Sequence, residues 1–130
     1  MIYLFTGDDT KNKFISYEKF IKSIPTSTAI FFINRNEFNP IQIESFYSGS
    51  SLFSVLSAVI FQNIFEREET RDFVLEKLKL MGESANSFIF LEGKLNKSIL
   101  DAVKKVRAEL NIFELSKEKI PQKLDNFKKL

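Results

Sequence analysis

The sequence contains no cysteine and no histidine. Without cysteine the chain cannot form a disulfide, a thiolate metal site or a thiol nucleophile. Without histidine it also lacks the commonest general base and the commonest zinc ligand of proteins. Any catalysis would therefore have to rest on Asp, Glu, Lys, Ser or Tyr side chains, and no metal site is expected.

Long apolar runs are missing as well. No stretch approaches the ~18 residues that a transmembrane helix requires, and no signal peptide precedes the first apolar run. We therefore expect a protein that has no membrane partner. We further expect the mature chain to start at Met1 and to remain cytoplasmic, in the compartment where it is made.

The sequence also lacks a large excess of charge of either sign. It contains 19 Lys and Arg residues and 17 Asp and Glu residues, so the formal net charge is only +2. This balance does not by itself indicate nucleic-acid binding. A length of 130 residues with 44% hydrophobic and 28% charged residues is typical of one folded domain with a single core.

Five short apolar runs recur along the chain, separated by segments with helical spacing. Their residues do not alternate between apolar and polar, which is typical of strands that are covered on both faces of a parallel sheet. The sequence therefore predicts a three-layer α/β domain with a five-stranded, mostly parallel sheet and helices on both faces. The predicted strands are Ile2–Phe5, Ala29–Ile33, Ala58–Phe61, Phe88–Leu91 and Ile112–Leu115.

Four helices are predicted between these strands from apolar residues spaced by three and four. Asn39 is a suitable N-cap for the second helix, which should be short, and the fourth helix should follow Asn96. The third helix should run from about Glu68 to Met81 and stop at Gly82. The four predicted apolar faces are Phe14, Tyr17, Ile21 and Ile24; Ile43, Phe46 and Tyr47; Val74, Leu78 and Met81; and Ile99, Val103, Val106 and Leu110.

The first strand, turn and helix nearly match a P-loop, in which Gly, four residues and Gly-Lys-Ser/Thr cradle phosphate. Gly7 and Lys13 stand at the expected spacing, but Asn12 replaces the second glycine. Phe14 replaces the hydroxyl residue that would hold magnesium. After the third strand, Asn63 occupies the place of the acidic residue that a P-loop NTPase uses. We therefore predict a degenerate P-loop architecture that does not hydrolyse ATP.

Two interpretations of the residues around this turn remain open. Asp8 and Asp9 could hold magnesium as in a receiver domain, but the acidic residue that such a site needs after the third strand is absent. The pair is better explained as a cap at the N-terminus of the first helix. Lys13 is either a phosphate ligand or a solvated lysine on the first helical turn.

The segment Ser51-Leu52-Phe53-Ser54 follows a Gly/Ser-rich break and precedes the third predicted strand. Leu52 and Phe53 either pack into the core or form an exposed apolar plug. Periodicity does not choose between these alternatives. An exposed plug would need a protein partner, because exposed apolar clusters mark interaction sites.

Three stretches, taken in order, resemble the N-terminal domain of the delta subunit of bacterial DNA polymerase III, the wrench of the sliding-clamp loader. The first stretch resembles the family's opening strand with its Gly and acidic turn. The next stretch is similar to its Ser-Leu-Phe block and the strand that follows, and the last is similar to its fourth strand and basic turn. They are Ile2–Asp9, Ser51–Phe53 with Ala58–Asn63, and Phe88–Ser98.

The resemblance implies that residues 1–116 form a degenerate AAA+ domain, without a cofactor or catalytic activity of its own, within the DNA polymerase III holoenzyme. In the family, a Leu-Phe pair enters a hydrophobic pocket of the ring-shaped clamp (the beta subunit) and helps to open the ring. Leu52 and Phe53 match that pair. Other clamp-loader subunits would be partners of a full-length chain, and DNA only an indirect one. Residues 117–130 would be a tail, a linker or the start of a lid domain.

A different function class is kept as the alternative. In it, the chain is a small phosphate- or nucleotide-binding α/β protein that uses the loop from Gly7 to Lys13. This alternative predicts nucleotide or magnesium binding that is indifferent to changes at Leu52 and Phe53.

Overall fold

A computed structural model of the chain describes residues 1–48 and 55–115. The described strands form one parallel sheet with the order β2-β3-β4-β1-β5. No helix of the described part is long and apolar enough to cross a membrane. The elements are β1 (Ile2–Thr6), α1 (Thr10–Ser23), β2 (Ala29–Asn34), the 3-10 helix η1 (Arg35–Glu37), α2 (Pro40–Ser48), β3 (Ser57–Gln62), the 3-10 helix η2 (Ile64–Glu66), α3 (Glu68–Glu83), β4 (Ser87–Leu91), α4 (Lys97–Lys105) and β5 (Glu109–Ile112).

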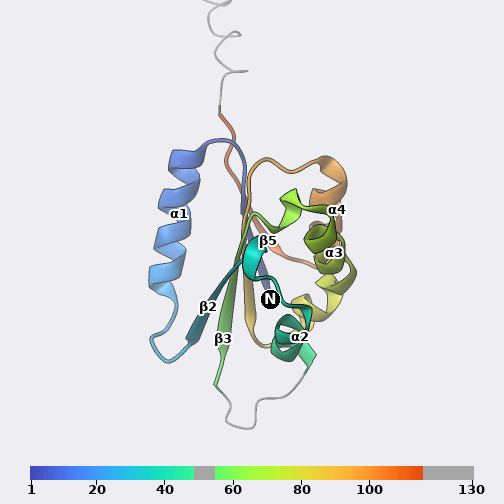
Figure 1. Cartoon of the computed structure of the whole chain (residues 1–130). Helices are drawn as coiled ribbons and strands as arrows, with labels where there is room; N and C mark the ends of the chain where they lie inside the picture. The colour runs from blue at the N-terminus through green and yellow to red at the C-terminus, as the bar shows by residue number, and fades with distance from the viewer. Residues whose placement is uncertain (49–54, 116–130) are drawn as a thin grey trace, which may run out of the picture.

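The domain has three layers, with α1 on one face of the sheet and α2, α3 and α4 on the other (Figure 1). The predicted α/β class, the five strands and the helices on both faces are therefore confirmed. All strand pairs are parallel, as the non-alternating apolar runs indicated.

The strand order distinguishes this sheet from that of receiver domains. In the flavodoxin-like order 2-1-3-4-5, which receivers share, β1 and β3 are neighbours. Here β4 lies between them, with Leu4 of β1 opposite Phe90 and Phe61 of β3 opposite the same residue. The receiver-like interpretation of Asp8 and Asp9 therefore does not agree with the topology.

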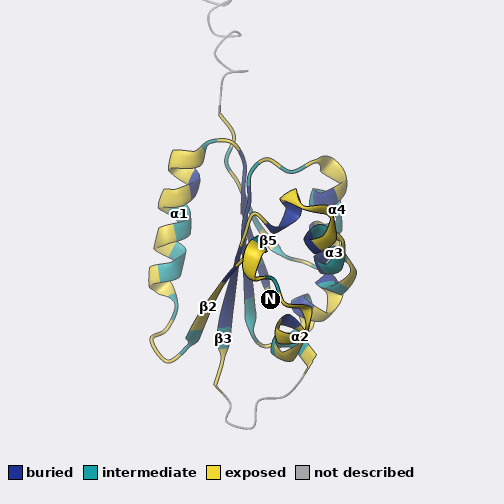
Figure 2. Cartoon of the chain, in the orientation of Figure 1, coloured by how far each residue is buried: buried dark blue, intermediate teal, exposed yellow. Residues whose placement is uncertain are grey.

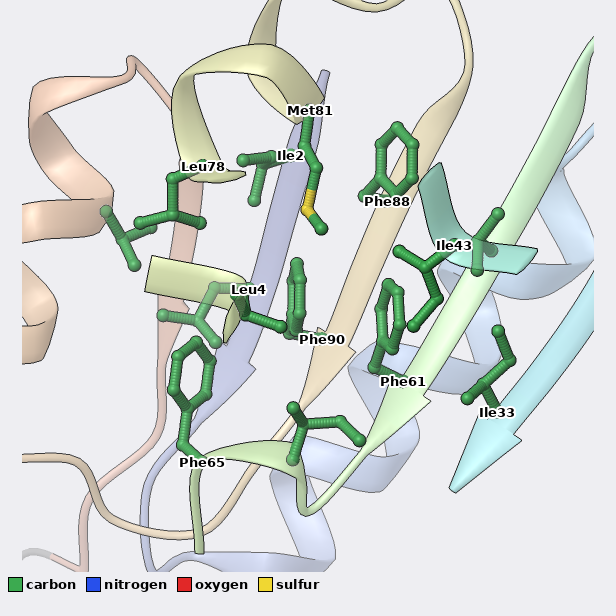
Figure 3. Packing of buried hydrophobic residues seen from close by; sticks show 14 of the residues in the cluster. Ile2, Leu4, Ile33, Ile43, Phe61, Phe65, Leu78, Met81, Phe88 and Phe90 are labelled. Carbon is green, nitrogen blue, oxygen red and sulfur yellow. The ribbon is translucent and has the colours of Figure 1, made fainter. Parts of the chain in front are cut away.

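The larger part of the core lies between the sheet and the three helices α2, α3 and α4. Phe61 and Phe90 stack there with ring centroids 4.7 Å apart, and Phe65 lies 5.6 Å from Phe90 (Figure 3). Ile43 of α2 and Met81 of α3 are fully buried against them. Val74 and Leu78 of α3 and Ile99 and Val103 of α4, which the spacing placed on the apolar faces, are also buried.

On the opposite face, α1 covers a smaller cluster. Phe5 of β1 contacts the rings of Tyr17 and Phe20, and Phe20 also lies 4.6 Å from Tyr3. Figure 2 shows β3 and β4 largely buried. Because both faces of these central strands are covered, their sequences carry apolar residues at consecutive positions.

The apolar face predicted for α1 was wrong at one residue. Phe14 is 40% exposed, whereas its neighbour Lys13 is buried. Tyr17, Ile21 and Ile24 pack on the sheet as predicted, Ile24 as the C-cap residue. Lys13 points toward the sheet because its ammonium has hydrogen-bond acceptors there, which the apolar pattern alone does not reveal.

Gly82 does not stop the third helix, as predicted, but lies inside it. The helix α3 runs on to Glu83 and is capped at Ser84. A Cβ at Gly82 would lie 3.3 Å from the carbonyl oxygen of Val106. The missing side chain therefore allows α3 and the end of α4 to approach each other.

The fourth helix follows Asn96 as predicted, but its end and the fifth strand were placed too far along the chain. The helix α4 ends at Lys105, and Arg107 adopts a left-handed conformation with φ of 60°. The Arg107 N–H donates to the Lys104 carbonyl at 3.0 Å, which closes the helix. Leu110 then pairs with Leu4 in the sheet. Leu110 follows Val106 at the spacing of a helical face, and this spacing suggested one continuous helix. A turn, not a helix, separates the two residues.

We predict that Phe61→Ala lowers the free energy of unfolding by about 3–5 kcal/mol, because it leaves a cavity beside Phe90. Chemical denaturation measures this change. Phe32→Ala is the matched control, since Phe61 is fully buried and Phe32 is 64% exposed. The control should cost less than about 1 kcal/mol, and equal losses at the two positions would contradict the packing described.

Candidate functional site

The turn after β1 is shaped by a glycine. Gly7 has φ of 125°, a conformation that residues with a side chain rarely adopt. A Cβ at this position would lie 1.7 Å from the carbonyl oxygen of Phe113. The Phe113 N–H in turn donates to the Thr6 carbonyl at 2.8 Å. The segment after β5 therefore lies directly against the turn.

The backbone amides of the turn are used within the protein. The Gly7 N–H donates to the Gly93 carbonyl at 3.2 Å, and the Asp9 N–H donates to the Phe113 carbonyl at 3.1 Å. The Asn12 N–H donates to Oδ1 of Asp9 at 3.3 Å. A phosphate-binding loop needs amides that point at the ligand. These three amides point at protein acceptors instead.

Lys13 closes the turn from inside. Only 6% of the residue is exposed, and its Nζ donates to the Gly7 carbonyl at 2.9 Å and to the Glu92 carbonyl at 2.7 Å. Burial lowers the pKa of Lys13, while the charges of Glu92 and Asp8 raise it. The expectation that Lys13 is solvated was wrong, because two backbone carbonyls replace water around its ammonium.

Glu92 is a second buried ionisable residue at this edge, and it lies directly after β4. Its carboxylate accepts hydrogen bonds from the Ile64 N–H at 3.0 Å and the Phe65 N–H at 3.1 Å. Only 1% of the residue is exposed. Burial raises the pKa of Glu92 to about 8, although the two N–H groups and Lys13 favour the charged form. Glu92 thus attaches η2 to the end of β4.

Asp8 and Asp9 stabilise local structure. Asp9 is the N-cap of α1, and its Oδ2 accepts from the Asn12 side-chain amide at 2.8 Å. Oδ1 of Asp8 accepts from the Leu115 N–H at 2.9 Å. The capping interpretation is confirmed for Asp9. Asp8 instead holds the chain that leaves β5.

Directly after β3, where a P-loop NTPase would carry an acidic residue, the chain makes a turn. Asn63 has φ of 54°, a left-handed conformation that asparagine tolerates better than most residues. Its N–H donates to the Leu91 carbonyl at 3.0 Å. Glu66, the nearest acidic residue after it, pairs with Arg35 at 2.7 Å. Neither side chain belongs to the turn around Lys13.

Together these contacts join the turn around Lys13 to the carboxyl edge of the sheet, the edge where parallel α/β proteins bind ligands. Gly7, Asn12 and Lys13 are each bonded to protein atoms. Nucleotide binding would require Lys13 and the amides to exchange protein acceptors for phosphate oxygens. The arrangement therefore favours a structural role for this turn over the alternative of a phosphate site.

The other predicted site residues, Leu52 and Phe53, lie outside the described part of the chain. The described residues on either side are Ser48, the last residue of α2, and Val55. Val55 and Leu56 are exposed by 48% and 51%. Residues 117–130 also lie outside the described part.

Comparisons with known proteins identify no family for the chain. No protein-family model matches it, and no curated protein is similar in sequence. Among solved structures, a DNA polymerase III gamma subunit-related protein from Thermotoga maritima aligns with 91% of this chain at 14% identity and a TM-score of 0.47. The chain spans 42% of the length of that protein. A likeness of this degree does not assign a function.

The sequence interpretation missed Glu92 as a member of this site. A signal was present, because an acidic residue directly follows a buried parallel strand and so must lie at the carboxyl edge. Its partners, the amides of Ile64 and Phe65, come from a segment 27 and 28 residues earlier.

We predict that Lys13→Met destabilises the fold by about 1–3 kcal/mol, because the carbonyls of Gly7 and Glu92 lose their buried donor. Denaturation by urea measures the loss. Lys11→Met is the control, since Lys11 lies on the same helical turn and is exposed. A Lys13→Met variant as stable as the control would contradict the structural role.

A second prediction concerns pH. The folded protein keeps the Glu92 proton up to about pH 8, whereas the unfolded chain releases it near its ordinary pKa of 4.5. The folded state therefore binds more protons between these values, and stability should fall as pH rises from about 5 to 8. The fall should be on the order of 3–5 kcal/mol.

To isolate the effect of Glu92, the free energy of unfolding of the wild type is compared with that of Glu92→Gln across the same pH range. The chain has no histidine to titrate there. Burial lowers the pKa of the Met1 amine, which acts in the opposite direction but equally in both proteins. The stability of the wild type relative to that of Glu92→Gln should fall as pH rises, because only the wild type has a carboxyl group to ionise. A constant difference would show that Glu92 does not carry the effect.

Proposed function

We propose that this chain is a delta-type clamp-loader domain, which binds the DNA polymerase sliding clamp and helps to open the ring without hydrolysing ATP. The domain has no catalytic activity in this proposal, and its contact with DNA is indirect. Leu52 and Phe53 are the residues proposed to enter the clamp.

The closed turn around Lys13 is the observation that carries the proposal. The Lys13 ammonium and the amides of Gly7, Asp9, Asn12 and Lys13 are bonded within the protein. This is the state expected of a P-loop architecture that has lost its nucleotide and kept its fold. It favours a binding domain over a nucleotide-dependent one.

The described residues on either side of the proposed clamp segment give further support. Ser48 ends α2 and Val55 precedes β3, so both lie toward the amino edge of the sheet. The closed turn follows the carboxyl end of β1. A contact near the amino edge is therefore independent of the edge that Lys13 closes. Val55 and Leu56 supply exposed apolar surface beside the segment.

The energetics are adequate for an anchor of two side chains. Burial of a Leu and a Phe side chain contributes on the order of 3–6 kcal/mol, from which the costs of association are subtracted. Opening of the ring requires only that the domain binds the sprung clamp surface more tightly than the closed one.

The test is calorimetric titration of a bacterial sliding clamp with the wild-type chain and with the double variant Leu52→Ala/Phe53→Ala. We expect micromolar binding by the wild type and a loss of at least about 100-fold in the variant, which corresponds to about 2.7 kcal/mol. The control is Ile15→Ala/Ile112→Ala, which removes two half-exposed apolar side chains elsewhere.

Circular dichroism would establish that all three proteins are folded. Binding that survives the double variant would overturn the assignment of Leu52 and Phe53. The absence of binding by the folded wild type would overturn the proposed function. Titration with ATP and magnesium in the same instrument then tests the alternative, for which we expect no heat of binding.

A further inference from the structure

The strand β2 forms one edge of the sheet and carries an unusual amount of exposed apolar surface. Ile30, Phe31 and Phe32 are exposed by 38%, 37% and 64%, and Figure 2 shows this strand largely in yellow beside the buried β3. Proteins normally protect an edge strand with charges, proline or a bulge, because an unprotected edge pairs with other strands.

The two edges of the sheet differ in this respect. The sequence of β2, AIFFIN, contains no charged residue and no proline. The strand at the other edge, β5, is shorter and contains Glu109 and Asn111. Of the described residues, only those of β3 pair with β2. The edge of β2 is therefore the unprotected one.

The direction of the free backbone groups follows from one hydrogen bond. The Ala29 N–H donates to the Leu56 carbonyl at 3.0 Å, so the polar groups of residue 29 point toward β3. Because these groups alternate along a strand, those of Ile30 and Phe32 point away from the sheet. They are available for pairing with a further strand.

We propose that two copies of this chain associate through β2, paired antiparallel about a two-fold axis at Phe31, so that their sheets become continuous. The proposal goes beyond the clamp-binding function and does not depend on it. A two-fold contact of this kind uses the edge of both copies and therefore closes as a dimer.

The register fits a second copy. With Phe31 opposite the same residue of the partner, Ile30 of each copy lies opposite Phe32 of the other. Residues 30 and 32 carry the outward backbone groups, so both pairs are hydrogen-bonded ones. They also place an aromatic ring beside a β-branched side chain on one face, which is a favourable cross-strand pair.

The charges near β2 do not oppose this contact. Arg35 and Glu37 follow the carboxyl end of the strand, and Arg35 is already paired with Glu66 at 2.7 Å. Antiparallel pairing brings this end against Thr26, Ser27 and Thr28 of the other copy, which are uncharged. A parallel arrangement would instead bring like charges together.

A contact of one strand and three apolar side chains is small, so the dimer should be weak and reversible. We expect half-dissociation at a concentration on the order of 10–100 μM. Sedimentation velocity of the full chain from about 1 μM to 1 mM should show a shift from monomer to dimer and no larger species.

Two variants act on different parts of the contact. Phe32→Lys removes the apolar partner of Ile30. Ile30→Pro removes an N–H that points away from the sheet, and proline is tolerated in edge strands. Each should weaken dimerisation at least about tenfold. The control is Ile112→Lys, which places the same charge on the other edge strand at a residue 45% exposed.

Amide hydrogen exchange followed by NMR gives a test on the unchanged protein. The amides of Ile30 and Phe32 should become protected as concentration rises. The amides of Phe31 and Ile33, which point toward β3, should be protected at every concentration. This readout remains decisive if a variant does not fold.

Three results of the sedimentation experiments would overturn the proposal. They are a wild type that stays monomeric to 1 mM, a dimer that persists in both β2 variants, and growth beyond the dimer. Protection of Ile30 and Phe32 that does not change with concentration would also overturn it, because no second copy would then cover the edge.

Discussion

The hydrogen bonds of the Lys13 ammonium are the constraint on which the carboxyl edge of the sheet depends. A buried ammonium is costly unless polar groups replace its water. Here the Gly7 carbonyl, which follows β1, and the Glu92 carbonyl, which follows β4, replace that water. The first turn of α1 is thereby fixed over two neighbouring strands. The residue that would bind phosphate in a P-loop instead holds the fold together.

Glu92 extends this closure to a third strand. Its carboxylate accepts hydrogen bonds from two backbone N–H groups of η2, and this joins the end of β4 to the segment that follows β3. Lys13 joins the ends of β4 and β1 in the same way. Two ionisable side chains thus replace a ligand as the organising element of the edge. These bonds occupy groups at the edge where a parallel α/β fold usually binds its ligand.

Large apolar side chains remain exposed at several places on the described surface. Two of these regions are β2 and the residues before β3, and Ile15, Ile41 and Leu80 are exposed elsewhere. Such exposure is costly for an isolated domain and is explained when a partner covers it. The two regions flank the sheet at different places and can therefore take different partners.

The sequence by itself determined the fold class, the five parallel strands, two of the four helical faces and the loss of the P-loop residues, because apolar periodicity and residue chemistry are local. It misplaced the end of α3, because Gly82 acts through its close approach to Val106 at the end of α4. It misplaced the end of α4 and β5, because the left-handed turn at Arg107 interrupts an apolar spacing that resembled a continuous helix. Only the tertiary structure decided that Lys13 is buried and that Glu92 belongs to the same edge. Their partners lie up to 79 residues away in the chain, and a hydrogen bond over such a separation leaves no periodic trace in the sequence.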